Sequence, residues 1–236
     1  MQEEEVIIKG ERAFYLLEVL RLKKGEKVYL MDGEGAYFLA ELIKAKKGRA
    51  SFKILEKQWR ERKPPFLEVG IPILKGNRTE TAIRALSQMG VVSFQPFLSE
   101  RTIVKMDERK KKQKQRRWQK QAMEEAELSQ MPFYPFVREI GRFPDILEKF
   151  GDIPLIIAYE GATFREEKLL YPLPQRVAII TGPEGGFSDK EIEKAREKGA
   201  YLVSLGENIL SAEFAPIVLA SLILFSYRFD TPLRVS

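Results

Sequence analysis

The stretch Ile179-Ile180-Thr181-Gly182-Pro183-Glu184-Gly185-Gly186-Phe187-Ser188-Asp189-Lys190-Glu191-Ile192 carries the strongest structural signal in the chain. The apolar run over 176–180 is typical of a buried strand, and it breaks into a glycine-rich turn. Ser188 and Glu191 then have the spacing of a capping box, which predicts a helix start. Such a strand, turn and helix N-terminus bring free backbone N–H groups up to a ligand. The plain alternative is a tight strand-to-helix connection.

The composition limits the available chemistry. The chain has 236 residues, of which 44% are hydrophobic and 31% charged, with no Cys and no His. These counts predict a globular protein that uses neither a Ser-His-Asp nor a Cys-His nucleophile and has no Cys/His zinc site. No apolar run is long enough to span a bilayer, and the acidic first residues lack the basic start of a signal peptide. We therefore expect a cytoplasmic protein with no membrane partner.

Positive charge is concentrated in one segment. Residues 101–120 contain ten Lys and Arg against Asp107 and Glu108, whereas the formal net charge of the whole chain is only +6. A basic block of this density favours binding to a polyanion, because each neutralised phosphate releases counterions. The alternative is a helix face that is merely solvated.

The pattern along the chain predicts two domains. Residues 1–66 form a small β-rich unit whose clearest feature is a hairpin turn at 32–35. Its predicted elements are a helix over 11–20 and strands over 27–31, 36–43 and 50–55. Pro64 and Pro65 mark the boundary, after which strands and helices alternate.

Residues 67–236 form the second domain, whose repeated βα units predict a largely parallel sheet with helices on both faces. The predicted strands cover 67–74, 91–97, 154–159, 177–181 and 200–205. Asn77 and Glu80 have the spacing of another capping box, and a long basic helix is expected over 107–128. The last helix is apolar enough to pack in a core or against a second subunit.

A second glycine loop follows a strand at 205–215, with the sequence Leu-Gly-Glu-Asn-Ile-Leu-Ser-Ala-Glu-Phe-Ala. Together with the turn at 182–186 it places two glycine loops at the C-terminal ends of parallel strands. Ligands bind at that edge of open α/β sheets. The sequence therefore predicts the binding site there.

This pair of loops resembles the RsmE family, the SPOUT-class enzymes that methylate uridine N3 in 16S ribosomal RNA. The most specific match is Gly-Pro-Glu-Gly-Gly at 182–186. Four further segments resemble family motifs in the same order: Val-Leu-Arg-Leu-Lys at 19–23, Lys-Gly-Asn-Arg at 75–78, Ser-Glu-Arg-Thr-Ile-Val-Lys at 99–105, and Trp-Gln-Lys at 118–120 followed by Glu-Glu-Ala-Glu at 124–127.

The resemblance implies a fold and partners. The expected fold class is a SPOUT-type α/β trefoil-knot domain with a mostly parallel sheet (67–236), preceded by a small PUA-like, RNA-binding β-barrel domain (1–66). The protein would act as a homodimer on 16S ribosomal RNA or the small ribosomal subunit. Its cofactor would be S-adenosylmethionine, and no metal is implied.

The resemblance also implies site residues. Cofactor contacts are expected from Ala158, Tyr159, Glu160, Thr181, Gly182, Pro183, Glu184, Gly185, Gly186, Leu205, Gly206, Ile209, Leu210 and Ala215. Glu213 is the first candidate for a general base or orienting group, with Arg101 as a second catalytic residue. The alternatives are a first-turn carboxylate that stabilises its helix and a solvated salt bridge. RNA contacts are expected from Arg21, Lys23, Arg109, Lys110, Lys112, Arg116 and Arg117.

Two family motifs are altered here. The family usually reads LRTETA where this chain has Leu210-Ser211-Ala212-Glu213-Phe214-Ala215, and QSGR where it has Leu-Ser-Gln-Met at 128–131. Arginine near a reacting uracil would hold a phosphate or stabilise the oxygens of the deprotonated ring. Two accounts are therefore open: an active enzyme that uses Arg101 or another basic residue, or a weakened or inactive paralogue that binds RNA or assists ribosome assembly.

Overall fold

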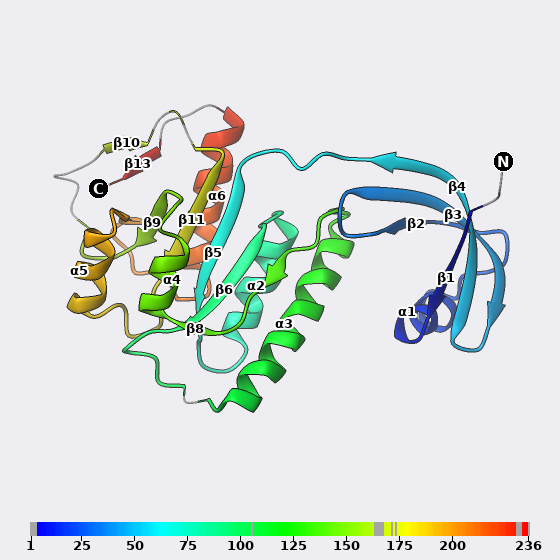
Figure 1. Ribbon diagram of the computed structural model, residues 1–236, viewed down its shortest axis with the longest axis horizontal. Helices are drawn as coiled ribbons and strands as arrows, with labels where there is room; N and C mark the ends of the chain where they lie inside the picture. Colours follow the sequence, from blue (N-terminus) through cyan, green and yellow to red (C-terminus); the bar gives the residue numbers. More distant parts are fainter. Residues whose placement is uncertain are drawn as a thin grey trace. The chain divides into compact units, whose positions relative to one another are not determined.

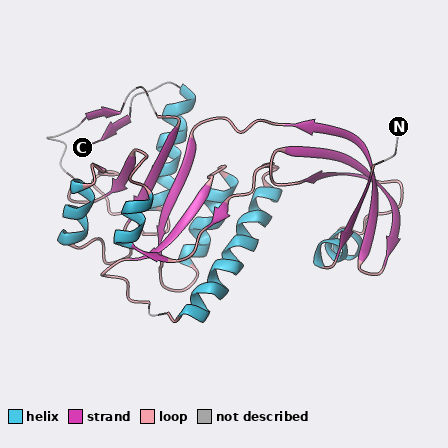
Figure 2. Cartoon of the chain, viewed as in Figure 1, coloured by secondary structure: helices cyan, strands magenta, loops and turns pink. Residues whose placement is uncertain are grey.

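The computed structural model describes residues 4–104, 106–162, 168–170, 172, 174–229 and 233–235 (Figures 1 and 2). Its contacts divide the chain into two compact units, which separate between Arg62 and Lys63. No helix in the described ranges combines the length and the apolar character needed to cross a membrane.

The N-terminal unit is a four-stranded antiparallel sheet in the order β1-β4-β3-β2. Its strands are β1 (Glu5–Lys9), β2 (Lys27–Met31), β3 (Ala36–Lys46) and β4 (Arg49–Trp59). The predicted hairpin turn is confirmed, and Asp32 Oδ1 stabilises it by accepting from the backbone N–H groups of residues 34, 35 and 36. Ala40, Leu42 and Phe52 are fully buried in the small core of this unit.

The predicted N-terminal helix is present and changes type along its length. α1 (Glu11–Phe14) continues as a π-helical turn, η1 (Tyr15–Val19). After the turn, Leu22 N donates to Leu16 O. Arg21, the residue just before Leu22, has a positive φ of 54°. Glycine or asparagine is usual in that left-handed conformation.

The C-terminal unit is built on a parallel sheet in the order β12-β9-β11-β5-β6-β7, with β8 also paired to β6. Its strands are β5 (Phe66–Pro72), β6 (Ser93–Leu98), β7 (Phe136–Val137), β8 (Gly141–Arg142), β9 (Leu155–Ala158), β11 (Arg176–Thr181) and β12 (Tyr201–Val203). A separate antiparallel pair joins β10 (Lys168–Leu170) and β13 (Leu233–Val235). The parallel arrangement predicted from the βα alternation is confirmed.

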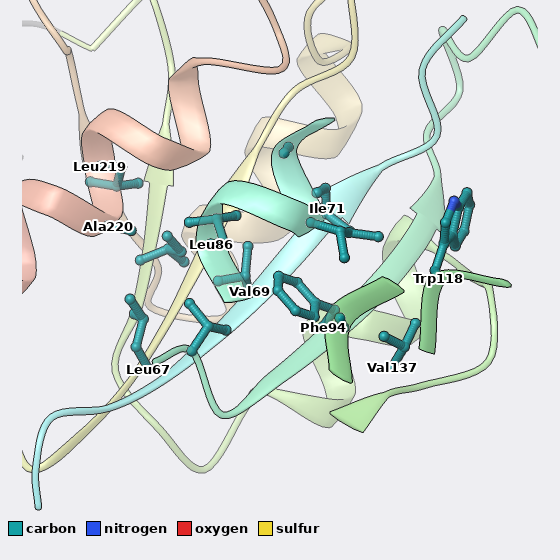
Figure 3. Close-up of a cluster of buried hydrophobic side chains, with 14 of the residues drawn as sticks. Leu67, Val69, Ile71, Leu86, Phe94, Trp118, Val137, Leu219 and Ala220 are labelled. Carbon is teal, nitrogen blue, oxygen red and sulfur yellow. The ribbon is translucent and has the colours of Figure 1, made fainter. Parts of the chain in front are cut away.

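Helices cover both faces of this sheet, as predicted. They are α2 (Arg78–Gln88), α3 (Glu108–Leu128), α4 (Phe143–Lys149), α5 (Asp189–Glu197) and α6 (Ala215–Phe229). Val177 and Ile179 of β11 pack in one core with residues of α2, α3 and α6, part of which Figure 3 shows. Ala178 and Ile180 point to the opposite face and pack with α4 and α5.

The two predicted capping boxes differ in outcome. At α5 the box is confirmed, because Ser188 Oγ accepts from Glu191 N at 3.2 Å and Ser188 N donates to Glu191 Oε2 at 2.9 Å. At α2 the prediction is wrong, because the side chain of Asn77 makes no capping hydrogen bond. Glu80 does not reach back to residue 77. It accepts instead from Arg117 on α3 at 2.5 Å, an interaction that joins α2 to α3.

Candidate functional site

Three strands of the C-terminal unit end side by side at one edge of the sheet. Ala158, the last residue of β9, lies opposite both Thr181 of β11 and Val203 of β12. The first residue beyond β9 stays in line, because Tyr159 N donates to Val203 O at 3.0 Å. The loops predicted from sequence as one binding site therefore do begin together.

The glycine turn after β11 is tightly constrained. Gly186 N donates to Pro183 O at 2.9 Å, and Gly186 has a φ of +67°, a conformation that favours glycine. A Cβ at Gly186 would lie 3.0 Å from Glu160 Oε1, and a Cβ at Gly182 would lie 3.2 Å from the Phe187 ring. These glycines therefore let the turn close against the loop after β9 and against its own phenylalanine.

Arg101 lies against the same turn. Its Nη1 donates to the carbonyl oxygen of Gly185 at 3.0 Å, and its Cβ would be 3.3 Å from a Cβ on that glycine. The side chain remains exposed. The structure therefore places Arg101, which is distant in sequence, beside the glycine loop. The hydrogen bond to Gly185 O also restricts the orientation of the other guanidinium nitrogens of Arg101.

The third loop, 204–214, leads from β12 into α6. Gly206 has a φ of +123°, and Ser204 Oγ donates to Gly206 O at 3.2 Å. Ile209 is 88% exposed, which leaves a large apolar side chain uncovered beside the loop edge. Leu210 is half-buried, and Ser211 O accepts from Phe214 N and Ala215 N as α6 begins.

Sequence reasoning did not assign Arg78 to the site, yet this residue lies between the two glutamates of the loops. Arg78 Nη1 is 3.8 Å from Glu184 Oε1, and Arg78 Nε is 3.7 Å from Glu213 Oε1. Glu184 Oε1 also accepts from Lys75 N at 3.0 Å. The available signal was the Lys-Gly-Asn-Arg turn at 75–78, which ends on this arginine, the first residue of α2.

Two buried polar atoms at the site have no hydrogen-bond partner among the described residues: Thr181 Oγ1 and Glu213 Oε2. Native proteins rarely leave such groups unpaired, since the loss costs about 1–3 kcal/mol each. The carboxylate oxygen is an acceptor and the hydroxyl is both a donor and an acceptor, so a ligand with polar groups would satisfy both. In the described part of the chain, no group of three or more carboxylates is placed to hold a metal ion.

The basic helix α3 is formed as predicted, and Asp107 caps it by accepting from Lys110 N at 2.7 Å. Most of the side chains expected to contact RNA are exposed along it, namely Arg109, Lys110, Lys112 and Arg116. Arg117 is also exposed, but its guanidinium is paired with Glu80. In the N-terminal unit, Arg21 and Lys23 are exposed as well.

The family comparison assigns this chain, with its glycine loops at the carboxyl edge of a parallel sheet, its basic helix and its N-terminal β unit, to the RNA methyltransferases. Residues 61–224 match the family described as an RNA methyltransferase domain, and residues 8–55 match the RNA methyltransferase PUA domain. The chain belongs to the family of the ribosomal RNA small subunit methyltransferases E, because proteins of that name are 30% and 34% identical to it over 92% of its length.

Individual relatives agree with that assignment. The chain is 30% identical to the Bacillus subtilis ribosomal RNA small subunit methyltransferase E over 92% of its own length and 88% of the relative. It is 34% identical to the protein of that name from Synechocystis, over 92% of this chain and 71% of the relative.

Solved structures confirm the SPOUT-type α/β fold with its PUA-like domain. The Neisseria gonorrhoeae ribosomal RNA small subunit methyltransferase E, bound to S-adenosyl methionine, superposes with a TM-score of 0.86 at 25% identity, covering 96% of this chain and 94% of that one. A Legionella pneumophila protein in complex with the bound cofactor SAM gives a TM-score of 0.85 at 27% identity, covering 95% and 93%.

Proposed function

We propose that this protein is an S-adenosylmethionine-dependent methyltransferase that acts on N3 of a uridine in 16S ribosomal RNA, in the cytoplasm. The observation that supports the proposal is that β9, β11 and β12 end side by side, so that the loops after them start together, with unpaired buried polar atoms at Thr181 and Glu213. Family membership supplies the substrate class.

The cofactor would lie among these loops. Thr181 and the glycine turn would line one side, residues Leu205, Gly206, Ile209 and Leu210 the other, and Ala158 to Glu160 the third. The exposed Ile209 would gain an apolar partner in the adenine, and glycine backbone would approach its polar edge. When bound, S-adenosylmethionine supplies an electrophilic methyl group carried on a sulfonium.

Glu213 is proposed to remove the N3 proton. Its buried Oε2 has no partner among the described residues, so this oxygen is available as a proton acceptor. As the N–H bond breaks, its electron pair stays on N3 and forms the new N–C bond, while the pair of the broken C–S bond stays on sulfur. Arg101, anchored on Gly185, would stabilise negative charge on the uracil oxygens.

The RNA is proposed to lie along α3. Arg109, Lys110, Lys112 and Arg116 are exposed on it and would contact phosphates, and Arg21 and Lys23 would add contacts from the PUA domain. Arg117 is the weakest member of the predicted set, because it neutralises the buried Glu80. We also propose a homodimer, formed through the apolar outer side of α6.

The alternative of an RNA-binding paralogue without turnover is not favoured. The altered motif at 211–215 lacks the family arginine, but the site retains two guanidinium groups, from Arg78 and Arg101. The relatives that match nearly the whole chain are named as methyltransferases.

Calorimetric titration with S-adenosylmethionine, followed by methyl transfer to unmodified small ribosomal subunits, tests the proposal. We expect micromolar binding, which corresponds to about −8 kcal/mol. We also expect a single N3-methyluridine in digested 16S RNA analysed by mass spectrometry. Absence of binding by the folded protein would favour the RNA-binding alternative. Binding with methylation at another base position would overturn the N3 assignment alone.

A further inference from the structure

Arg78 occupies an unusual position between two carboxylates. It is within ion-pair distance of Glu184 and Glu213, at 3.8 Å and 3.7 Å, but neither contact is as short as a hydrogen bond. Among the described residues, no hydrogen bond to its guanidinium is found. Glu184 is itself held by the backbone N–H of Lys75, three residues before Arg78. The guanidinium of Arg78 thus lies between the negative charges of Glu184 and Glu213.

The two oxygens of Glu213 differ in environment. Oε1 is the atom near Arg78 Nε, whereas Oε2 is buried and unpaired among the described residues. In such a carboxylate, one oxygen is paired with a cation and the other can still accept a hydrogen bond or a proton. The same arginine therefore defines which oxygen of Glu213 is open to accept a proton.

The charges of the three side chains balance once a proton has been transferred. Two carboxylates and one guanidinium carry one net negative charge before the transfer. Once Glu213 has accepted a proton, Arg78 remains balanced by Glu184. No uncompensated charge is then left on the protein at the moment the uracil becomes anionic.

We propose that Arg78 is a positioning residue for methyl transfer: it holds Glu213 through Oε1, so that Oε2 receives the proton from the target base. Glu184 anchors Arg78 rather than taking part in the reaction. This inference rests on the proposed function.

A double-mutant cycle tests whether Arg78 acts through Glu213. For Arg78→Met we expect kcat to fall about 100-fold, with the Kd for S-adenosylmethionine and the KM for small subunits within about 3-fold of wild type. Glu213→Gln should lose at least as much. The double variant should be no slower than Glu213→Gln alone, because the two residues act as one unit. Arg78→Lys, which keeps the charge, should recover about 10-fold over the methionine variant.

Arg84→Met is the matched control. Arg84 lies on the same helix, is similarly exposed, and pairs with Glu125 away from the loops. We expect this variant to lower thermal stability and leave kcat unchanged. Should Arg78→Met fail to fold, Arg78→Lys takes its place in the cycle.

Three results would overturn the inference. Losses that multiply in the double variant would show that Arg78 acts independently of Glu213. A raised KM with unchanged kcat would make Arg78 an RNA contact. Full activity of Arg78→Met would remove its role. By contrast, if the wild type neither binds S-adenosylmethionine nor transfers methyl groups, the proposed function itself is overturned, and this inference with it.

Discussion

Ser99 donates a hydrogen bond from its Oγ to the buried carboxylate of Glu191, 3.0 Å away, and so ties the turn before Arg101 to the first turn of α5. Glu191 also accepts from Glu100 N at 3.0 Å and from Ser188 N at 2.9 Å. A single carboxylate therefore caps α5 and fixes the segment that carries Arg101 against the glycine turn.

Replacement of this carboxylate should weaken both the fold and the site. In Glu191→Ala three donors lose their acceptor, and we expect the free energy of unfolding to fall by about 2–3 kcal/mol. Since Arg101 is no longer fixed, kcat should fall further than in a variant destabilised elsewhere. Urea unfolding and a methyl-transfer assay on the folded fraction measure the two effects. Glu193→Ala, an exposed α5 variant, should change neither.

The hydroxyl of Thr181 offers a cleaner test of the cofactor site than the neighbouring glycines do. A side chain at Gly182 would push on the Phe187 ring, so loss of binding there would also report on a displaced loop. Thr181→Val removes an unpaired buried hydroxyl and keeps the shape of the side chain.

We expect Thr181→Val to be as stable as wild type or more so, because an unsatisfied group is replaced by an apolar one. Its affinity for S-adenosylmethionine should fall about 10-fold, as expected for one lost hydrogen bond. Thermal unfolding and calorimetry provide the two readouts. Unchanged affinity would show that the Thr181 hydroxyl does not contact the cofactor.

The sheet and the glycine loops were predictable because their signals are local. Apolar runs identify β11 and β12, although glycine marks the end of β11 alone, since β12 ends at Val203, three residues before Gly206. The Ser188–Glu191 spacing identifies the start of α5. The pairing of parallel strands then follows from the alternation of strands and helices. Each of these inferences uses residues close together in the sequence.

The parts that sequence reasoning missed depend on long-range contacts between side chains. Arg78 meets Glu184 and Glu213 only after three separate loops assemble at one edge. For the same reason Glu80 looked like a capping residue, although Arg117 on α3 recruits it. The spacing of Asn77 and Glu80 is the same as that of Ser188 and Glu191, where the capping box does form. Only the packing of α2 against α3 distinguishes the two pairs.

Arg21 combines an unfavourable backbone conformation with an exposed charge, and it belongs to the set of residues that we propose to contact RNA. In Arg21→Gly we expect the N-terminal unit to gain about 0.5–1 kcal/mol, measured by hydrogen exchange of its strands. Affinity for RNA should weaken, and the slope of log K against log salt should decrease by about 1.

Gln130→Gly is the control for this variant, because Gln130 also has a positive φ, of 55°, at the end of a helix. It should leave the salt slope unchanged. An unaltered slope in Arg21→Gly would mean that Arg21 contacts no phosphate.

Acid should destabilise the C-terminal unit through Glu68, which is buried on β5. Burial opposes its charged form, but hydrogen bonds from Ser93 and Arg176 and the charges of Arg176 and Arg138 outweigh this and lower the pKa of Glu68. The unfolded chain then binds this proton more readily, starting near a pKa of about 4.3. The stabilisation is present above that pH and is lost as the pH falls through the lower pKa of the folded state.

We therefore expect Glu68→Gln to be less stable than wild type at neutral pH and to show a shallower loss of stability below about pH 5. The buried Trp118 reports on this unit by fluorescence if the exposed Trp59 is first changed to phenylalanine. Glu197→Gln, at an exposed position of α5, should retain the acid dependence of the wild type. Parallel curves for Glu68→Gln and wild type would rule out Glu68 as the titrating group.

The outer side of α6 should form the homodimer interface. On the inner side of α6, Leu219 and Ile223 are buried. On the outer side, Leu222, Phe225 and Phe229 are 42%, 56% and 59% exposed. The rings of Phe225 and Phe229 contact one another, with centroids 4.6 Å apart, and extend one apolar surface along the helix. Exposed apolar surface of this kind marks an interaction site, and the proximity of α6 to Glu213 would place a second copy beside the loops.

Sedimentation should accordingly give twice the chain mass of 27.3 kDa for the wild type and the single mass for Phe225→Glu. Because the glutamate points to solvent in the monomer, the variant should remain folded, and any loss of cofactor affinity would show that dimerisation completes the site. Phe136→Glu changes an equally exposed phenylalanine on β7 and should stay dimeric. A monomeric wild type at micromolar concentration would leave this apolar surface without a role in self-association.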